Sequence, residues 1–309
     1  MIPAASSSVR SQRLEIVIIV ESPSISEDAV RLVQRIKNFA TNQNRRTVLS
    51  HDARQRFLDQ FDEFQANEAA REVAGLLRPR KLPELEWIGS RRDGGYALAR
   101  QSIVPPRDWA ISIGVGQEVS ADVALAARGV RVYLFDPYVD EPRLPNQNLV
   151  FYKKGLGSKP PDLLPLSDLV EHCEEDGPPS ILLLDIEGAE WASLGGEAAA
   201  LGLFDQIAIE LHGLGDLANP KKAERIVETL RVLTQSHTPV FWRANNHGGL
   251  LSIGGYCVPD VLEVSLVRDS LLAELPESTS PFTPALQNSK SLPPIFARRI
   301  FSPSTAPPQ

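Results

Sequence analysis

Between about residues 108 and 268, short apolar runs alternate with stretches in which apolar residues recur at helical spacing. This alternation is typical of βαβ units and of a parallel sheet. The run 181–184 contains only isoleucine and leucine, as expected for a strand that is buried on both faces of such a sheet. The pattern therefore predicts an α/β domain in this part of the chain.

The segments on either side of this region have different patterns. Segment 1–80 has helical periodicity at 26–39 and 51–77, and we expect it to be a helical cap or a homo-oligomerisation segment. Segment 269–309 is dense in Pro, Ser and Thr and is expected to be poorly ordered. The predicted domain proper then spans 81–268.

Composition and charge narrow the class of protein. With 309 residues, of which 42% are hydrophobic, the chain can form a substantial core. Its net charge of -7 argues against sequence-independent binding to nucleic acid. The apolar run 16–20 is too short to cross a bilayer and lacks the layout of a secretory signal. Cys173 and Cys257 have no metal-ligand spacing and indicate reduced thiols, as in a cytoplasmic protein.

Three carboxylates follow the run 181–184, namely Asp185, Glu187 and Glu190. The carboxyl end of a parallel strand is the place where such sheets bind ligands. Asp185 is equally compatible with capping a helix that begins near Glu190. The segment alone thus leaves a functional and a purely structural interpretation open.

A second candidate feature lies at the first βα junction. Gly114 and Gly116 allow a sharp turn and a close approach to a ligand, and Asp136 ends the next strand at about the 20-residue distance typical of an acid that binds ribose. The dinucleotide fingerprint needs a third glycine, where this chain has Val119. The loop therefore suits S-adenosylmethionine, which has no pyrophosphate, better than NAD, while an ordinary turn remains the structural alternative.

Three motifs resemble those of the FkbM-like class I methyltransferases. In chain order they are Ser112-Ile113-Gly114-Val115-Gly116, Phe135-Asp136-Pro137 and Leu184-Asp185-Ile186-Glu187-Gly188-Ala189-Glu190. The third motif is the most specific. Segments at Asp93-Gly94-Gly95-Tyr96 and Arg243-Ala244-Asn245-Asn246 extend the resemblance over about residues 86–268.

The resemblance implies a Rossmann-like α/β fold, with a seven-stranded, mostly parallel sheet whose last strand is reversed, in addition to the amino-terminal helical segment. It also implies S-adenosylmethionine as the cofactor. The candidate cofactor-binding residues are Gly114, Gly116, Glu118, Asp136 and Asp185.

The resemblance further implies methylation of a hydroxyl on a sugar, glycan or other natural product. The candidate substrate-binding residues are Asp93, Tyr96, Arg243 and Asn246. Some relatives have histidine at the position of Arg243. Arginine can instead bind a carboxylate, a phosphate or a sugar hydroxyl, and a polar turn after a buried strand is an equally good interpretation.

A hydroxyl acceptor needs a general base, because few alcohols ionise near neutral pH. Glu210 and His212 are two residues apart at the end of a predicted strand, so we expect both to project toward the catalytic edge of the sheet. We predict that His212 is the base, that Glu210 orients it, and that Glu187 assists. His247 is the substitute candidate for the base.

Other interpretations remain open. Asp185 with Glu187 or Glu210 has the oxygen ligands that Mg²⁺ prefers, but the spacing is not diagnostic of a metal. An NAD- or nucleotide-sugar-binding oxidoreductase is disfavoured by the incomplete glycine fingerprint and by the lack of a Tyr-x-x-x-Lys pair. A non-catalytic methyltransferase-like scaffold that acts through its amino-terminal helices is the third class. The expected partner is a small-molecule or glycan acceptor, with no nucleic acid and no membrane.

Overall fold

A computed structural model describes residues 65–80, 82, 84–100, 103, 109–142, 146–159, 161–173, 177–272 and 300–301. They all belong to the unit formed by Arg56–Gln309. Most of the expected amino-terminal helical segment lies outside these residues, although 65–76 is helical. Most of the segment expected to be poorly ordered also lies outside them. In the part of the chain that is described, no helix has the length and apolar character needed to cross a membrane.

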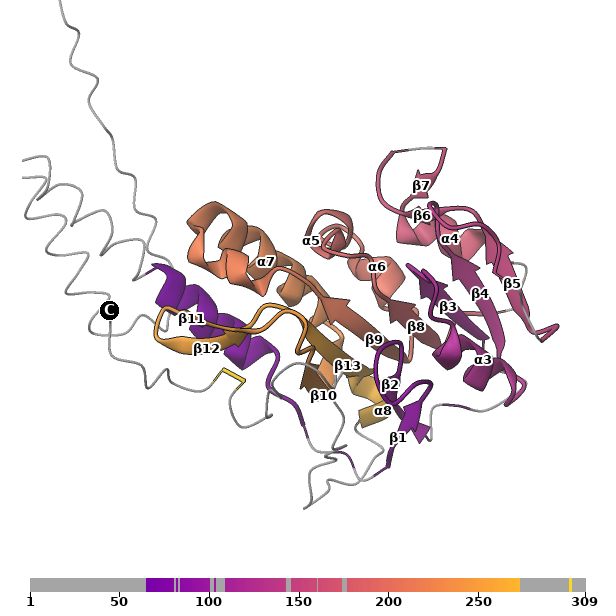
Figure 1. The fold of residues 1–309 in the computed structure, drawn as a ribbon, viewed down its shortest axis with the longest axis horizontal. Coiled ribbons are helices and arrows are strands. Elements are labelled where there is room, and N and C mark those ends of the chain that lie inside the picture. Colours follow the sequence, from indigo (N-terminus) through magenta and orange to yellow (C-terminus); the bar gives the residue numbers. More distant parts are fainter. Residues whose placement is uncertain are drawn as a thin grey trace, which may run out of the picture. The chain divides into compact units, whose positions relative to one another are not determined.

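Seven strands form the central sheet (Figure 1). In spatial order they are β10 (His237–Ala244), β13 (Leu262–Arg268), β9 (Gln206–Leu211), β8 (Ile181–Leu184), β3 (Trp109–Ile113), β4 (Arg131–Phe135) and β5 (Leu149–Tyr152). The last strand, β13, is antiparallel to both of its neighbours, and the remaining pairs are parallel. The predicted Rossmann-like sheet with a reversed last strand is confirmed.

Helices cover both faces of this sheet, as expected for strands that are buried throughout. They are α3 (Ser120–Ala126), α4 (Leu166–Glu171), α5 (Glu190–Ser193), α6 (Ala198–Leu201), η3 (Leu214–Ala218), α7 (Pro220–Leu233) and α8 (Asp269–Leu272). Residues of α4, α6, α7 and helix 65–76 share one apolar cluster, whereas α3 packs in a second cluster on the other face (Figure 1).

The strand sequences explain this two-sided packing, because successive side chains point to opposite faces. In β8, for example, Leu182 and Leu184 belong to the first cluster, whereas Ile181 and Leu183 belong to the second. All four are at most 2% exposed. A strand of uninterrupted apolar residues thus has an apolar partner on each face.

Three short strand pairs complete the fold. They are β1 (Leu85–Ile88) with β2 (Tyr96–Ala99), β6 (Gly155–Leu156) with β7 (Leu163–Leu164), and β11 (Leu250–Ile253) with β12 (Tyr256–Pro259). The β1–β2 pair is a hairpin whose turn contains Asp93, Gly94 and Gly95. The backbone N–H of Ser90 in its turn donates to Oγ of Ser120 at 2.7 Å, so the hairpin turn contacts the start of α3 beside the carboxyl end of β3.

Candidate active site

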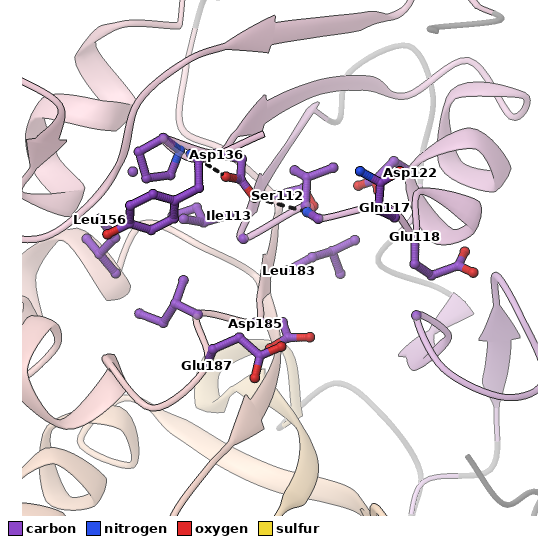
Figure 2. Close-up of a pocket in the computed structure, with 18 of the residues that line it drawn as sticks. Ser112, Ile113, Gln117, Glu118, Asp122, Asp136, Leu156, Leu183, Asp185 and Glu187 are labelled. Carbon is purple, nitrogen blue, oxygen red and sulfur yellow. Dashed lines mark hydrogen bonds between the residues drawn. The ribbon is translucent and has the colours of Figure 1, made fainter. Parts of the chain in front are cut away.

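A cavity of about 580 Å³ lies at the carboxyl ends of β3, β4 and β8 (Figure 2). This volume is within the range of sites that bind small molecules and cofactors. The residues lining it include Asp93, Tyr96, Ser112, Gly114, Gly116, Glu118, Asp122, Asp136, Tyr138, Leu156, Asp185, Ile186 and Glu187. The sheet therefore brings together every predicted cofactor residue, although they come from separate βα junctions.

The glycine loop brings the ends of β3 and β8 close together. Gly114 has a φ of 81°, and a Cβ atom at this position would overlap the backbone carbonyl oxygen of Asp185. Only glycine combines this left-handed conformation with so close an approach. Gly116 has a φ of 56°, and its backbone N–H points to the next acid of the site.

Asp136, which is 5% exposed, fixes this loop. Its Oδ2 accepts a hydrogen bond from the backbone N–H of Gly116 at 3.0 Å, and its Oδ1 accepts from Tyr138 at 2.8 Å and Val139 at 3.1 Å. A carboxylate has about four acceptor positions, so one remains on Oδ2 for a ligand hydroxyl. Asp136, the residue predicted to bind ribose, thus holds the glycine loop in place.

Asp122 is a site residue that the sequence reasoning missed. Its side chain lines the cavity from the first turn of α3 and is 3% exposed. Burial raises its pKa to about 6, although a hydrogen bond with the Ser112 side chain partly opposes this rise. Its Oδ1 is buried and has no hydrogen-bond partner. An acid in the first turn of a helix ordinarily indicates only a favourable helix dipole, which is why the sequence pattern did not single it out.

His212 follows β9, and a carboxylate holds it in place. Its Nδ1 lies 3.0 Å from Oε1 of Glu190, which is fully buried and also accepts from the backbone N–H of Gly188 at 3.2 Å. The expectation that Glu210 orients His212 is therefore corrected. Glu190 is the first residue of α5 and the partner of the imidazole. In the sequence, the signal for this role was the position of Glu190 in the acid-rich motif at 185–190.

The other ring nitrogen of His212 faces two acids of the cavity. Nε2 lies 3.8 Å from Oδ1 of Asp185 and 3.5 Å from Oε2 of Glu187. His212 itself is not among the residues that line the cavity, whereas both acids are. The side chain of Glu187 is 84% exposed, and its φ of 53° is unusual for a residue with a side chain. Glu187 therefore both lines the cavity and is exposed to solvent.

Burial and the charges of neighbouring groups shift the pKa values of His212 and Asp185. Burial opposes protonation of His212, but the hydrogen bond to Glu190 and the charges of Glu190, Asp185 and Glu210 together raise its pKa. The pKa of the Asp185 carboxyl is raised by burial and by the charge of Glu210. The cluster therefore retains a proton more firmly than its isolated groups would.

Glu210 belongs to a different set of contacts. Its Oε1 accepts a hydrogen bond from Nδ2 of Asn245 at 2.6 Å, and burial raises its pKa. The strand register places Glu263 of β13 directly opposite Glu210. Glu210 is thus bound within the protein, and its influence on His212 is through its charge.

Arg243 pairs with Glu263 instead of lining the cavity. Its Nε donates to Oε2 of Glu263 at 2.8 Å, and one Nη donates to Oε1 of the same residue at 2.5 Å. The guanidinium also lies 4.6 Å from the ring centroid of Trp87, and it donates to the carbonyl oxygen of Arg92 at 2.8 Å. The side chains of Arg243 and Glu263 are at most 5% exposed. The expected role of Arg243 in substrate binding is therefore corrected to a structural one.

Of the remaining predicted residues, some line the cavity and others do not. Asp93 and Tyr96 of the β1–β2 hairpin line the cavity, and so does Glu118, whose Oε1 accepts from the backbone N–H of Ser120 at 2.8 Å. Burial raises the pKa of Tyr96, so its hydroxyl stays protonated and can donate a hydrogen bond. Asn246 is 5% exposed and is not part of the lining.

The charge of the cavity lining has one sign. Among the described residues that form it, six are acids, and neither lysine nor arginine is present. The acids are Asp93, Glu118, Asp122, Asp136, Asp185 and Glu187. Such a lining attracts cations and repels phosphate groups.

Comparison with known families agrees with this geometry. Residues 89–236 match the family model of the methyltransferase FkbM domain. This segment is an FkbM methyltransferase domain. The resemblance drawn from the three motifs is thereby confirmed, and the FkbM domain contains the glycine loop, Asp136, Asp185 and His212. Among curated proteins, none matches the sequence at a significant level.

Several solved structures are distantly similar to this chain. The Burkholderia thailandensis 1,6-didemethyltoxoflavin-N1-methyltransferase, solved with S-adenosylhomocysteine, is 15% identical, with a TM-score of 0.28 over 81% of this chain and 93% of that chain. The 16S rRNA (adenine(1408)-N(1))-methyltransferase from Catenulisporales acidiphilia is 13% identical, with a TM-score of 0.30 over 63% and 100%. The Methanococcus jannaschii fibrillarin pre-rRNA processing protein is 12% identical, with a TM-score of 0.32 over 62% and 86%. At such low similarity, the fold assignment rests on the strand order of the sheet.

Proposed function

We propose that this protein transfers a methyl group from S-adenosylmethionine to a hydroxyl of a small-molecule or glycan acceptor. The observation that carries the proposal is the acidic cavity at the glycine loop, with the His212–Glu190 pair beside its mouth. The matched FkbM domain supports the reaction class. The acceptor class is an inference from the hydroxyl chemistry that a histidine base would serve.

The charge of the cavity distinguishes the two cofactor classes. A dinucleotide would bring two phosphates into a lining of six acids that includes no lysine or arginine among the described residues. S-adenosylmethionine instead carries a sulfonium, an ammonium and one carboxylate, so its net charge is positive, and it lacks phosphate. The acidic lining therefore favours S-adenosylmethionine over NAD, and with it the methyltransferase over the oxidoreductase.

The protein groups have distinct roles in the proposed reaction. When bound, S-adenosylmethionine supplies a methyl group activated by the sulfonium. Asp136 offers its free acceptor position to the ribose, and the glycine loop lets the backbone approach the ligand. Nε2 of His212 would accept the proton of the acceptor hydroxyl, whose oxygen would take the methyl group that the cofactor supplies. Glu190 holds the imidazole in orientation.

The raised pKa of His212 is compatible with its role as a base, because the positive charge of the bound cofactor would lower this pKa. In the absence of a ligand, the surrounding carboxylates stabilise the imidazolium, which cannot accept a proton. His212 loses its proton more readily when a cation occupies the cavity, because like charges repel in a partly buried site. Cofactor binding is therefore expected to release a proton and to generate the neutral base.

A divalent cation is a second interpretation of the same cluster. One ligand atom each of Asp185, Glu187 and His212 lies within 4.8 Å of the others, and the Nδ1 contact of His212 with a carboxylate is common behind metal-bound imidazoles. A cation would position and acidify the acceptor hydroxyl. Full activity after dialysis against a strong chelator would exclude this interpretation, whereas activity restored by Mg²⁺ would replace the base mechanism.

Calorimetry and an acceptor screen test the proposal together. We expect the full chain to bind S-adenosylmethionine but not NAD, and Asp136→Ala to weaken that binding because the glycine loop loses its anchor. Transfer of labelled methyl to a panel of hydroxylated sugars and natural products should then identify the acceptor. Binding of NAD, or of neither cofactor, would contradict the proposed function. Binding without transfer to any acceptor would favour the non-catalytic scaffold.

A further inference from the structure

We infer that Asp122 binds the ammonium group of the amino-acid part of S-adenosylmethionine, and so selects ligands that carry this group over those that carry adenosine alone. The inference rests on the proposed function, since it names the partner of one side chain in the proposed cofactor site. It assigns a binding role to a residue outside the glycine loop and outside the acid-rich motif.

Asp122 has a buried carboxylate oxygen without a partner. Its side chain is 3% exposed and lines the cavity, and its Oδ1 makes no hydrogen bond. Its pKa, raised to about 6, leaves the carboxylate mostly ionised at neutral pH. An ionised, buried carboxylate is unfavourable unless a cation or a donor pairs with it. The described lining offers no lysine or arginine for this purpose, so a cationic group of a ligand would supply a charged partner that the cavity lacks.

The acids around the cavity lie at different places and have different partners. Figure 2 shows Asp136 on one side of the glycine loop, Asp122 on the other, and Asp185 with Glu187 below them. Asp136 is occupied by three backbone N–H groups and has one position left for a hydroxyl. Asp185 and Glu187 face His212, where the proposed reaction requires the sulfonium. The two other acids of the lining, Asp93 and Glu118, are exposed. The buried Asp122 is therefore the acid that we assign to the second cation of the cofactor.

Glu118 is the nearest alternative to Asp122, and its setting is different. Its side chain is exposed, and its Oε1 already accepts from the backbone N–H of Ser120. An exposed carboxylate binds a cation weakly because water competes for it. Glu171→Gln is the control, since Glu171 is an exposed acid at the end of α4 that does not line the cavity.

The test compares ligands with and without the amino-acid part. S-adenosylhomocysteine carries the ammonium and the carboxylate of the amino-acid part, whereas 5′-methylthioadenosine retains the adenosine and the thioether but lacks both groups. In calorimetry on the full chain, Asp122→Asn should weaken S-adenosylhomocysteine by about tenfold or more, because a buried, charge-assisted hydrogen bond is lost. Its affinity for 5′-methylthioadenosine should stay within about twofold. Glu171→Gln should change neither affinity by more than about threefold.

The outcomes separate this inference from the proposed function. Equal losses for both ligands, or no loss for either, would overturn the role of Asp122 while leaving the cofactor intact. Failure of the unaltered protein to bind any of these ligands would overturn both proposals. If Asp122→Asn does not fold, as judged by thermal unfolding, Ser112→Ala is the second variant. It removes the hydroxyl that bonds to Asp122 and should weaken S-adenosylhomocysteine selectively, whereas an unchanged ratio of the two affinities would count against the inference.

Discussion

Two clusters of charged side chains lie at the same edge of the sheet, and they differ in how far the protein itself satisfies them. The open cluster consists of Asp185, Glu187, Glu190 and His212, and the paired cluster consists of Glu210, Arg243, Asn245 and Glu263. Both contain buried acids, and the sequence pattern suggested function for both.

The difference lies in the buried polar atoms that lack a partner. In the open cluster, Oδ1 of Asp185 and Oε2 of Glu190 are buried without hydrogen bonds. In the paired cluster, Arg243 binds both oxygens of Glu263, and although its Nη1 has no hydrogen bond, the guanidinium faces Trp87. Buried charged groups without hydrogen-bond partners beside a cavity indicate a ligand-binding site. Buried charged groups that pair with each other indicate a structural role.

His212→Ala is the strongest test of the open cluster. We expect kcat to fall by about a hundredfold to ten-thousandfold, because the general base is removed, while S-adenosylmethionine still binds. Single-turnover methyl transfer and calorimetry measure the two effects separately. His172→Ala is the control, since His172 is an exposed histidine at the end of α4. Near-normal turnover in His212→Ala would remove His212 from the mechanism.

Arg243→Met tests the paired cluster. Removal of one partner leaves Glu263 buried and unpaired, which we expect to reduce the free energy of unfolding by about 3 to 5 kcal/mol in urea titrations. The double variant Arg243→Met with Glu263→Leu should recover much of this loss, because no unpaired charge remains. A full loss of cofactor binding in a stably folded Arg243→Met variant would instead assign Arg243 to the site.

Glu190→Gln tests the link between orientation and proton affinity. We expect kcat to fall on the order of tenfold to a hundredfold, as for carboxylates that orient metal-bound imidazoles. The Glu190 carboxylate raises the pKa of His212, so its loss should lower that pKa. The rising limb of the profile of kcat/KM against pH should then move to lower pH, since the imidazole becomes neutral earlier. An unmoved limb would show that Glu190 does not control the protonation of His212.

We expect Arg128→Met to have the smallest effect of these variants, and it serves as a reference for the buried pair of Arg243 and Glu263. Arg128 forms two hydrogen bonds with Glu86, at 2.6 and 2.9 Å, but both side chains are about one-third exposed. Water and salt screen such a pair, so the free energy of unfolding should change by about 1 kcal/mol or less. A change as large as that of Arg243→Met would mean that burial is not what separates the two ion pairs.

The fold was predictable because its information is local in the sequence. Uninterrupted apolar runs such as Ile181–Leu184 indicate strands buried on both faces, and the alternation with helical segments indicates their parallel arrangement. The glycine loop, Asp136 and the acid-rich motif indicated which strand ends meet. These residues needed no tertiary information, because the order of βα units determines that their ends share one edge.

The partners within the site were not predictable in the same way. Glu210 and His212 have the spacing of a same-face pair, yet the contact to His212 comes from Glu190, which is 22 residues away in the chain. Arg243 and Glu263 meet because β10 and β13 are paired in register. Such choices depend on strand register and on which side chain reaches an unsatisfied atom.

By itself, the sequence determined the α/β architecture, the resemblance to FkbM methyltransferases and most of the acids at one edge of the sheet, because periodicity and motif spacing are properties of the chain alone. Only the tertiary structure decided which of these acids are satisfied and which are open to a ligand. The physical reason is that the cost of a buried charge depends on its neighbours in space. Asp122 illustrates this dependence, since its sequence position indicates a helix start, whereas its burial without a partner for Oδ1 indicates a cation site.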